Sequence, residues 1–166
     1  MELPNLRPAD RARVKIGNRT MRASARLTKV ACLRGVPCFL ENPASSLLWA
    51  APPIARSFSR GGGRRHVLDF CQFGKPRRKR TAIASWGAPP WTDICRQCSG
   101  RGGACSRTGA PHVQLTGVDK SSGQLWTRIA EPYPASLCSK AADHLVSSFV
   151  MSRSVWARSI AFGRQE

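Results

Sequence analysis

Apolar and polar positions follow a helical pattern in the first part of the chain and a strand pattern after it. Residues 10–34 contain no proline, and their apolar side chains fall at spacings that line one face of a helix. These are Ile16, Ala23, Leu27, Val30 and Ala31. Gly17–Asn18 could divide this helix in two, and Gly35 is a natural C-terminal stop. The apolar run Val36–Leu40 then predicts a buried strand, in which Cys38 is a core thiol.

Two further strands are predicted after a proline-rich connection. The connection spans residues 42–65, and Ala44–Ala50 within it is expected to form a short helix. His66–Phe70 and Thr81–Trp86 have the composition of strands. Polar residues follow the first two strands, which is how an open α/β sheet builds a site at the carboxyl ends of its strands. We therefore expect an α/β fold with a mixed sheet of partial Rossmann-like type and helices against it.

Turn-forming residues dominate the next part of the chain, so residues 87–120 are expected to be an irregular Cys/Gly-rich segment. A helix is predicted from Pro134 to about Val150, because several of its residues share one face. These are Leu137, Ala141, His144, Leu145 and Ser148. The chain thus divides into an α/β part (1–86), the irregular segment (87–120) and a C-terminal helical part (121–166).

The chain is strongly basic, and this bears on its partner. It has 27 Lys and Arg against 9 Asp and Glu, which gives a formal net charge of +18. Such a charge attracts polyanions, and the planar guanidinium of arginine suits phosphates and guanine edges. We therefore expect nucleic acid as the partner. The alternative is that the arginine-rich composition reflects coding bias in a partial or poorly constrained reading frame.

The sequence offers no membrane anchor. No run approaches the roughly 20 apolar residues of a membrane-spanning helix, and the N-terminus lacks the pattern of a secretory signal. We expect a soluble intracellular protein with no membrane partner, and a nuclear one if Lys75–Arg80 acts as an import signal. Without a secretory signal, the 7 cysteines favour reduced thiols or metal ligands over a disulfide framework. The oligomeric state is not predicted by these patterns.

Four soft ligands follow one another in the irregular segment, as Cys95-x2-Cys98-x6-Cys105-x6-His112. A tetrahedral zinc ion would supply the cross-link that such a glycine-rich segment otherwise lacks. Cys95–Gly102 also resembles one repeat of the zinc region of J-domain chaperones, which uses paired repeats where this chain has one. The alternative is three reduced thiols and a surface histidine on a loop, because the second half of the spacing is not that of a standard zinc finger.

Two motifs resemble the middle of cytosine-C5 DNA methyltransferases. Phe39-Leu-Glu-Asn-Pro43 matches a Glu-Asn pair that follows one strand of that family, and Gln72-Phe-Gly-Lys-Pro76 with its basic run matches an aromatic-Gly-x-Pro-Gln-x-Arg-x-Arg motif after a later strand. The longer pattern looks closer to divergent methyltransferase-like proteins of phages and mobile elements. Its further parts are Ile16-Gly-Asn18, Asn42-Pro-x-Ser-Ser46, Leu48-Trp49, Cys105-Ser-x-Thr-Gly-x-x-His112, Tyr133-Pro134 and Leu137-Cys138.

The resemblance implies a methyltransferase-type sheet and a role in DNA binding. Glu41 matches the acid that hydrogen-bonds the flipped cytosine while a cysteine thiolate attacks C6, and Asn42 would hold the loop. The basic residues Arg77, Arg78, Lys79 and Arg80 would hold the sugar-phosphate. The alternative for Glu41 is a solvent-facing carboxylate at a strand end, and for the basic run a solvated charge cluster.

Several departures limit what the resemblance implies. Pro43 stands where the family has valine, and no glycine-rich loop for S-adenosylmethionine precedes Gly35. Pro37-Cys38 is the only Pro-Cys pair, but it lies inside the first strand and not in a nucleophile loop. We therefore expect a fragment that resembles the back half of a methyltransferase, uses S-adenosylmethionine only if a missing N-terminal half is supplied, and is inactive alone. Whether it is an enzyme stays open. The rivals are a non-enzymatic basic, zinc-binding nucleic-acid-binding module and a truncated product without selected activity.

Overall fold

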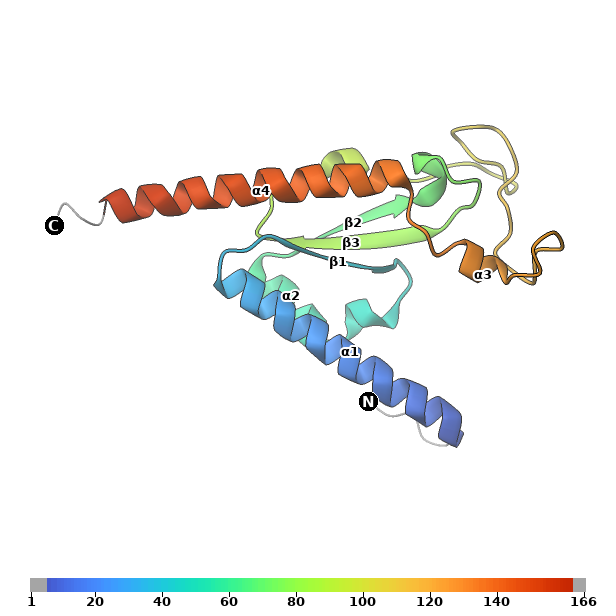
Figure 1. The fold of residues 1–166 in the computed structure, drawn as a ribbon, viewed down its shortest axis with the longest axis horizontal. Coiled ribbons are helices and arrows are strands. Elements are labelled where there is room, and N and C mark those ends of the chain that lie inside the picture. Colours follow the sequence, from blue (N-terminus) through green and yellow to red (C-terminus); the bar gives the residue numbers. More distant parts are fainter. Residues whose placement is uncertain (1–5, 163–166) are drawn as a thin grey trace.

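The structure is a computed structural model that describes residues 6–162, with side chains described as far as residue 152. α-Helices and strands alternate as far as the second strand, and only helical elements follow the third (Figure 1). The α-helices are α1 (Pro8–Leu33), α2 (Pro52–Gly61), α3 (Trp126–Ile129) and α4 (Ala135–Phe162). The strands are β1 (Cys38–Pro43), β2 (Arg64–Asp69) and β3 (Arg80–Trp86). Short 3-10 turns are η1 (Leu47–Ala50), η2 (Phe70–Phe73) and η3 (Thr92–Ile94).

The sheet has three strands in the order β1-β3-β2, and both neighbouring pairs are antiparallel. The central strand β3 pairs with β1 from Trp86 to Thr81 and with β2 from Ser85 to Arg80. The α/β class is confirmed, whereas the mixed, Rossmann-like sheet is not. A parallel pair needs a crossover of about a dozen residues or more, usually through a helix, and only residues 70–79 separate β2 from β3.

Helices cover both faces of the sheet, α4 on one side and α1 with α2 on the other (Figure 1). On the α4 side the core is formed by Leu68, Phe70, Phe73, Ile83, Trp91, Ile94 and Leu137. On the other side the Trp86 side chain is fully buried, and its indole N–H donates to the Ser57 carbonyl of α2 at 3.0 Å. The Glu41-Asn42 motif thus lies in a small sheet that helices cover on both faces, and the Gln72–Pro76 motif lies beside it.

Helix α1 is predicted well in its extent but not in its orientation. It runs unbroken through Gly17–Asn18. The expected apolar face is wrong, because Ile16, Leu27 and Val30 are 64%, 72% and 56% exposed, and Thr28 is the buried residue of this helix. The physical reason is that α1 packs more on α2 than on the sheet. A Cβ on Gly61 of α2 would lie 3.2 Å from Cys32 Sγ of α1, so this close packing depends on glycine.

The segment between β1 and β2 departs most from the prediction. The first strand extends to Pro43, so that the Glu-Asn motif lies inside β1 and not after it. The short helix expected at Ala44–Ala50 is only the turn η1, which Ser46 caps with its hydroxyl. Helix α2 was not predicted, although its two prolines stand in the first turn, where proline is tolerated. Gly62, with φ of +63°, ends it.

The C-terminal helix was predicted, and it continues to Phe162, beyond the expected end at Val150. Its inward face is as predicted, since Leu137 and Ser148 are buried and Ala141 packs against the core. His144 stacks on Trp91, with ring centroids 4.8 Å apart. None of the helices within residues 6–162 combines the length and apolarity that a bilayer span requires.

Candidate metal centre

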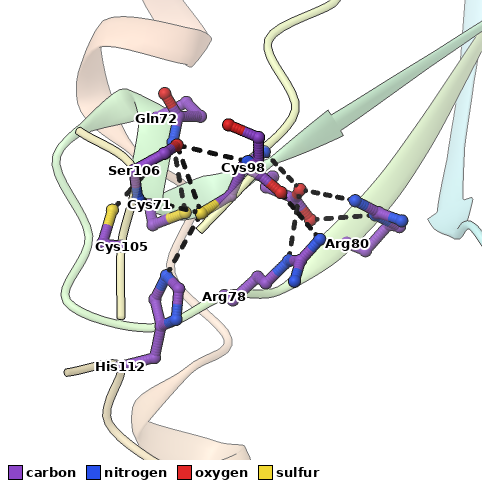
Figure 2. A network of polar contacts seen from close by, with 10 residues as sticks. Cys71, Gln72, Arg78, Arg80, Cys98, Cys105, Ser106 and His112 are labelled. Carbon is purple, nitrogen blue, oxygen red and sulfur yellow. Dashed lines mark hydrogen bonds and ion pairs between the residues drawn. The ribbon is translucent and has the colours of Figure 1, made fainter. Parts of the chain in front are cut away.

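Three thiols and one imidazole converge beside the end of β2. They belong to Cys71, Cys98, Cys105 and His112, and their ligand atoms all lie within 4.8 Å of one another (Figure 2). Cys71 is in η2, directly after β2, and the other three come from the irregular segment after β3. The three cysteines are buried and form a cluster of their own. Such a group of donors could hold a metal ion.

The donor set fits zinc. A Cys₃His set is one of the common structural zinc sites, with zinc–sulfur bonds of about 2.3 Å and zinc–nitrogen bonds of about 2.0–2.1 Å. In a tetrahedron with these bond lengths the ligand atoms are about 3.5–3.8 Å apart. Cys98 Sγ and His112 Nε2 are 3.6 Å apart, which already matches. The widest separation of 4.8 Å would have to shorten by about an ångström.

Local turns bring the donors together. The Cys105 N–H donates to the Ala110 carbonyl at 2.8 Å, and the Gly109 N–H donates back to the Cys105 carbonyl at 2.7 Å. This turn returns the chain so that His112 lies next to Cys105. Gly100 permits the approach from the other side, because a Cβ there would lie 1.9 Å from the Ala104 carbonyl oxygen. Gly100 is therefore needed for the geometry of the cluster.

Hydrogen bonds favour the thiolate form that a metal requires. Burial raises the pKa of Cys98, but hydrogen bonds from Ser106, the Gly100 N–H and Cys71 together outweigh it and lower the pKa to about 6. The hydroxyl oxygen of Ser106 lies 3.5 Å from Cys98 Sγ, and the backbone nitrogen of Ser106 lies 3.3 Å from it. The pKa of Cys105 is likewise lowered, against the effect of burial, by the N–H groups of Arg107 and Thr108. Burial, with the hydrogen bond to Cys98, raises the pKa of Cys71 to about 12. Cys71 thus keeps a proton that a metal ion would displace.

Two charged residues fix the backbone of Cys98 from both sides (Figure 2). The Cys98 N–H donates to Asp69 Oδ2 at 2.7 Å, and its carbonyl accepts from Arg78 Nη2 at 2.8 Å. Asp69 is fully buried and also accepts from Arg80 Nη2 at 3.0 Å. Burial raises the pKa of Asp69, but the bonds from Arg80, the Cys98 N–H and Arg78 hold it below its ordinary value. These bonds tie the sheet to the segment from Cys98 to His112, the candidate metal loop, which carries three of the four donors.

Three of the four ligands predicted from spacing are in the cluster, and the fourth member differs. Cys98, Cys105 and His112 are together, whereas Cys95 lies outside, with its Sγ 3.6 Å from His66 Nδ1. Cys71 takes the fourth place. A spacing pattern confined to one segment misses Cys71, because it precedes β3 and reaches the cluster through the β2–β3 hairpin. The available signal was a cysteine directly after a strand, where the sheet presents polar groups.

Each residue of the basic run 77–80 has a partner within the protein, although Arg78 and Arg80 remain partly exposed to water. Arg78 and Arg80 bind Asp69. Arg77 is only 6% exposed, and its Nη2 donates to the Pro132 carbonyl at 3.5 Å. The Lys79 ammonium lies over the ring of Phe70, 5.0 Å from its centroid. Phosphate contact by this run stays a prediction, but a phosphate would have to compete with these partners.

Glu41 and Asn42 are adjacent residues of a strand, so their side chains point to opposite faces of the sheet. The Glu41 Oε2 accepts a short hydrogen bond from the Tyr133 hydroxyl, while its Oε1 is buried without a partner. Burial and this hydrogen bond raise the pKa of Tyr133. Glu41 is therefore held from the α4 side, and Asn42 does not face the same space.

No family model, curated protein or solved structure matches the chain. The geometry of the described residues and the sequence motifs are therefore the grounds on which a function can be proposed.

Proposed function

We propose that the chain is a nucleic-acid-binding α/β module in which Cys71, Cys98, Cys105 and His112 hold a structural zinc ion. The observation that supports it best is the convergence of these four donors, from segments on both sides of β3, within 4.8 Å. The cluster lies in a part of the chain with little regular structure, where a cross-link stabilises most. The net charge of +18 points to a polyanion as partner.

The zinc ion would act as a cross-link and not as a catalyst. All four tetrahedral positions would be taken by protein donors, so no position is left for water or substrate. A zinc ion with three thiolates carries a net charge of about −1. Nearby cations offset it: Arg107 donates to the Cys71 carbonyl at 2.8 Å, and Arg78 to that of Cys98. His112 would bind in its neutral form through Nε2.

Zinc content and one pair of serine variants test the metal site. We expect one zinc ion per chain in the purified protein, measured by elemental mass spectrometry. Cys71→Ser should lose it, and Cys95→Ser, which changes a cysteine outside the cluster, should keep it. Retention of zinc by Cys71→Ser together with its loss in Cys95→Ser would contradict the proposed ligand set.

Nucleic-acid binding is tested separately. The protein should bind a labelled duplex with an affinity that falls steeply with salt, because phosphate contacts release counterions. Fluorescence anisotropy over a salt series measures this. If the zinc-loaded protein shows no salt-dependent binding to duplex or single strands, the proposed partner is wrong, whatever the result for the metal.

A second candidate function rests on Glu41. The half-buried carboxylate accepts a hydrogen bond from Tyr133 through one oxygen, and its other oxygen has no partner. This arrangement suits an acid that forms hydrogen bonds with a nucleobase. The motifs around it resemble those of cytosine-C5 methyltransferases, so the chain would be the base-binding part of a methyltransferase-like protein. The chain alone should then transfer no labelled methyl group from S-adenosylmethionine to cytosine. Detectable transfer would replace the first proposal with an enzymatic one.

A further inference from the structure

Helices α1 and α2 lie on the side of the sheet away from α4 (Figure 1). Residues of both helices line a groove that is rich in cations. Its volume is about 470 Å³. Five of its lining residues are basic, and none is acidic. The basic residues are Arg22, Arg26, Lys29, Arg56 and Arg60. The two helices thus face each other with charge of one sign across a hollow.

The cations of α1 form one continuous row. Lys15, Arg19, Arg22, Arg26 and Lys29 follow one another at steps of 4, 3, 4 and 3 residues. These steps keep all five on one face of the helix, and at 1.5 Å per residue the row is about 21 Å long. Arg56 and Arg60 of α2 are also four residues apart and add a shorter row across the groove.

These side chains have no ion-pair or hydrogen-bond partners among the described residues. Within residues 6–162, the ion pairs and side-chain hydrogen bonds involve none of the seven cations of the two rows. The seven are all exposed. The basic run 77–80 contrasts with them, since it is bound to Asp69, to a carbonyl and to aromatic rings. The groove is therefore the more available cationic surface.

Like charges at these spacings weaken the helix that carries them. Each such exposed pair of like charges at i,i+3 or i,i+4 destabilises the helix slightly. Helix α1 has seven Lys or Arg and a single Asp, Asp10, which lies in its first turn away from the groove. A bound polyanion would remove this repulsion, so the charge pattern favours an occupied groove.

We infer that this groove binds the phosphate backbone of duplex nucleic acid. The inference rests on the proposed nucleic-acid function and names the surface that performs it. A DNA strand carries a phosphate every 3.4 Å or so along the helix axis, so a row of about 21 Å can meet several of them. The lining also includes the apolar side chains of Leu33 and Pro53, which can lie against sugars.

An anionic membrane surface is the rival occupant, and the geometry disfavours it. Helices that lie on membranes bury an apolar face in the same plane that their cations approach. Here the cations face each other across a hollow, and of the large exposed apolar residues of α1 only Leu33 lines the groove, whereas Ile16, Leu27 and Val30 do not. Backbone phosphates can enter the groove between the two rows of cations, whereas a flat lipid surface would contact only the outer edges of the groove.

Two variants with equal loss of charge test the groove. Arg26→Gln/Arg56→Gln/Arg60→Gln removes three groove cations, and Arg101→Gln/Lys120→Gln/Arg128→Gln removes three exposed cations elsewhere, so both lower the net charge from +18 to +15. We expect the groove variant to bind a labelled duplex about tenfold or more weakly than the control variant at about 50 mM salt. Its log–log salt slope should be flatter by about 2–3. Circular dichroism and zinc content check that both remain folded.

Chemical protection of the unmodified protein provides a second measurement. Acetylation of Lys29 should slow when duplex is bound, while that of Lys120 should not change. Equal binding by the two variants, or no protection of Lys29, overturns the groove as the site while leaving nucleic-acid binding itself intact. Binding to phosphatidylserine vesicles with no binding to duplex would overturn both and favour the membrane. Failure of the unmodified protein to bind any nucleic acid would instead refute the proposed function.

Discussion

Asp69 joins the sheet to the candidate metal loop. Its carboxylate accepts from the Cys98 N–H, Arg78 and Arg80, and the side chain is fully buried. Asp69→Asn removes the charge and leaves two guanidinium groups without their anion. Loss of a buried ion-pair partner costs up to about 3–5 kcal/mol, but Arg78 and Arg80 are half-exposed to water, so we expect about 1–3 kcal/mol. Urea unfolding of the zinc-loaded protein measures it, and the variant should also bind zinc more weakly.

Asp93→Asn is the matched control. Asp93 pairs with Lys140 at 2.8 Å, but its side chain is 52% exposed and that pair does not involve the cysteine cluster. An exposed pair of this kind is worth about 0–1 kcal/mol. Equal losses of stability and zinc affinity in the two variants would show that Asp69 does not position Cys98.

The elements with strong local signals were predictable from sequence. The proline-free stretch that became α1 and the apolar alternation of β3 were found close to their observed bounds. Helix α2 was missed because two adjacent prolines and three glycines suggest a loop, although both prolines lie in its first turn. The orientation of α1 was not predictable, since its partner is this unpredicted helix and not the sheet. Strand direction, which separates an antiparallel sheet from a Rossmann-like one, also lies beyond local pattern.

The candidate metal cluster shows the same limit. Spacing alone identified Cys98, Cys105 and His112, because they lie within one irregular segment. Cys71 joins them only because the β2–β3 hairpin folds back, and sequence distance hides this contact. The basic run 77–80 is the converse case. Its sequence is also compatible with a solvated charge cluster, yet Arg78 and Arg80 pair with Asp69, a buried carboxylate that precedes them by about ten residues.

Metal removal should loosen two segments and spare the sheet. Chelation of the zinc-loaded protein should speed amide hydrogen exchange in residues 98–113 and around η2, since the cross-link between them is lost. The bonds at risk include Cys105 N–H to Ala110 and Val113 N–H to Pro76. The ladders of β3 with β1 and β2 should stay protected. Exchange rates measured by mass spectrometry before and after chelation provide the comparison.

Two outcomes would count against this expectation. Unchanged exchange after the metal has been shown to leave would mean that the cluster does not hold the loop. Loss of protection over the whole sheet would mean that the metal is required for the fold itself and not only for the irregular segment. Addition of zinc should restore the original rates, which separates metal loss from damage by the chelator.

Charge is unevenly distributed over the molecule. Three acids, Asp10, Asp69 and Asp93, take part in the ion pairs of the described residues, while the rows on α1 and α2 have no anionic partners there. Cations that pair with acids therefore differ from those of the two rows, which repel one another. Self-repulsion of a chain with a net charge of +18 opposes the compact state.

Moderate salt should therefore stabilise the protein. Raising ionic strength from about 10 mM to about 100 mM shortens the screening length from roughly 30 Å to 10 Å, which weakens repulsion along the rows and across the groove. The same change weakens the exposed ion pairs only slightly, because each contributes little, and the buried Asp69 is screened less. We expect the melting temperature to rise with salt, measured by calorimetry. The rise should be smaller in Arg26→Gln/Arg56→Gln/Arg60→Gln than in Arg101→Gln/Lys120→Gln/Arg128→Gln, because the first removes closely spaced charges of the groove. A melting temperature that falls with salt, or an equal rise in both variants, would show that groove repulsion does not govern stability.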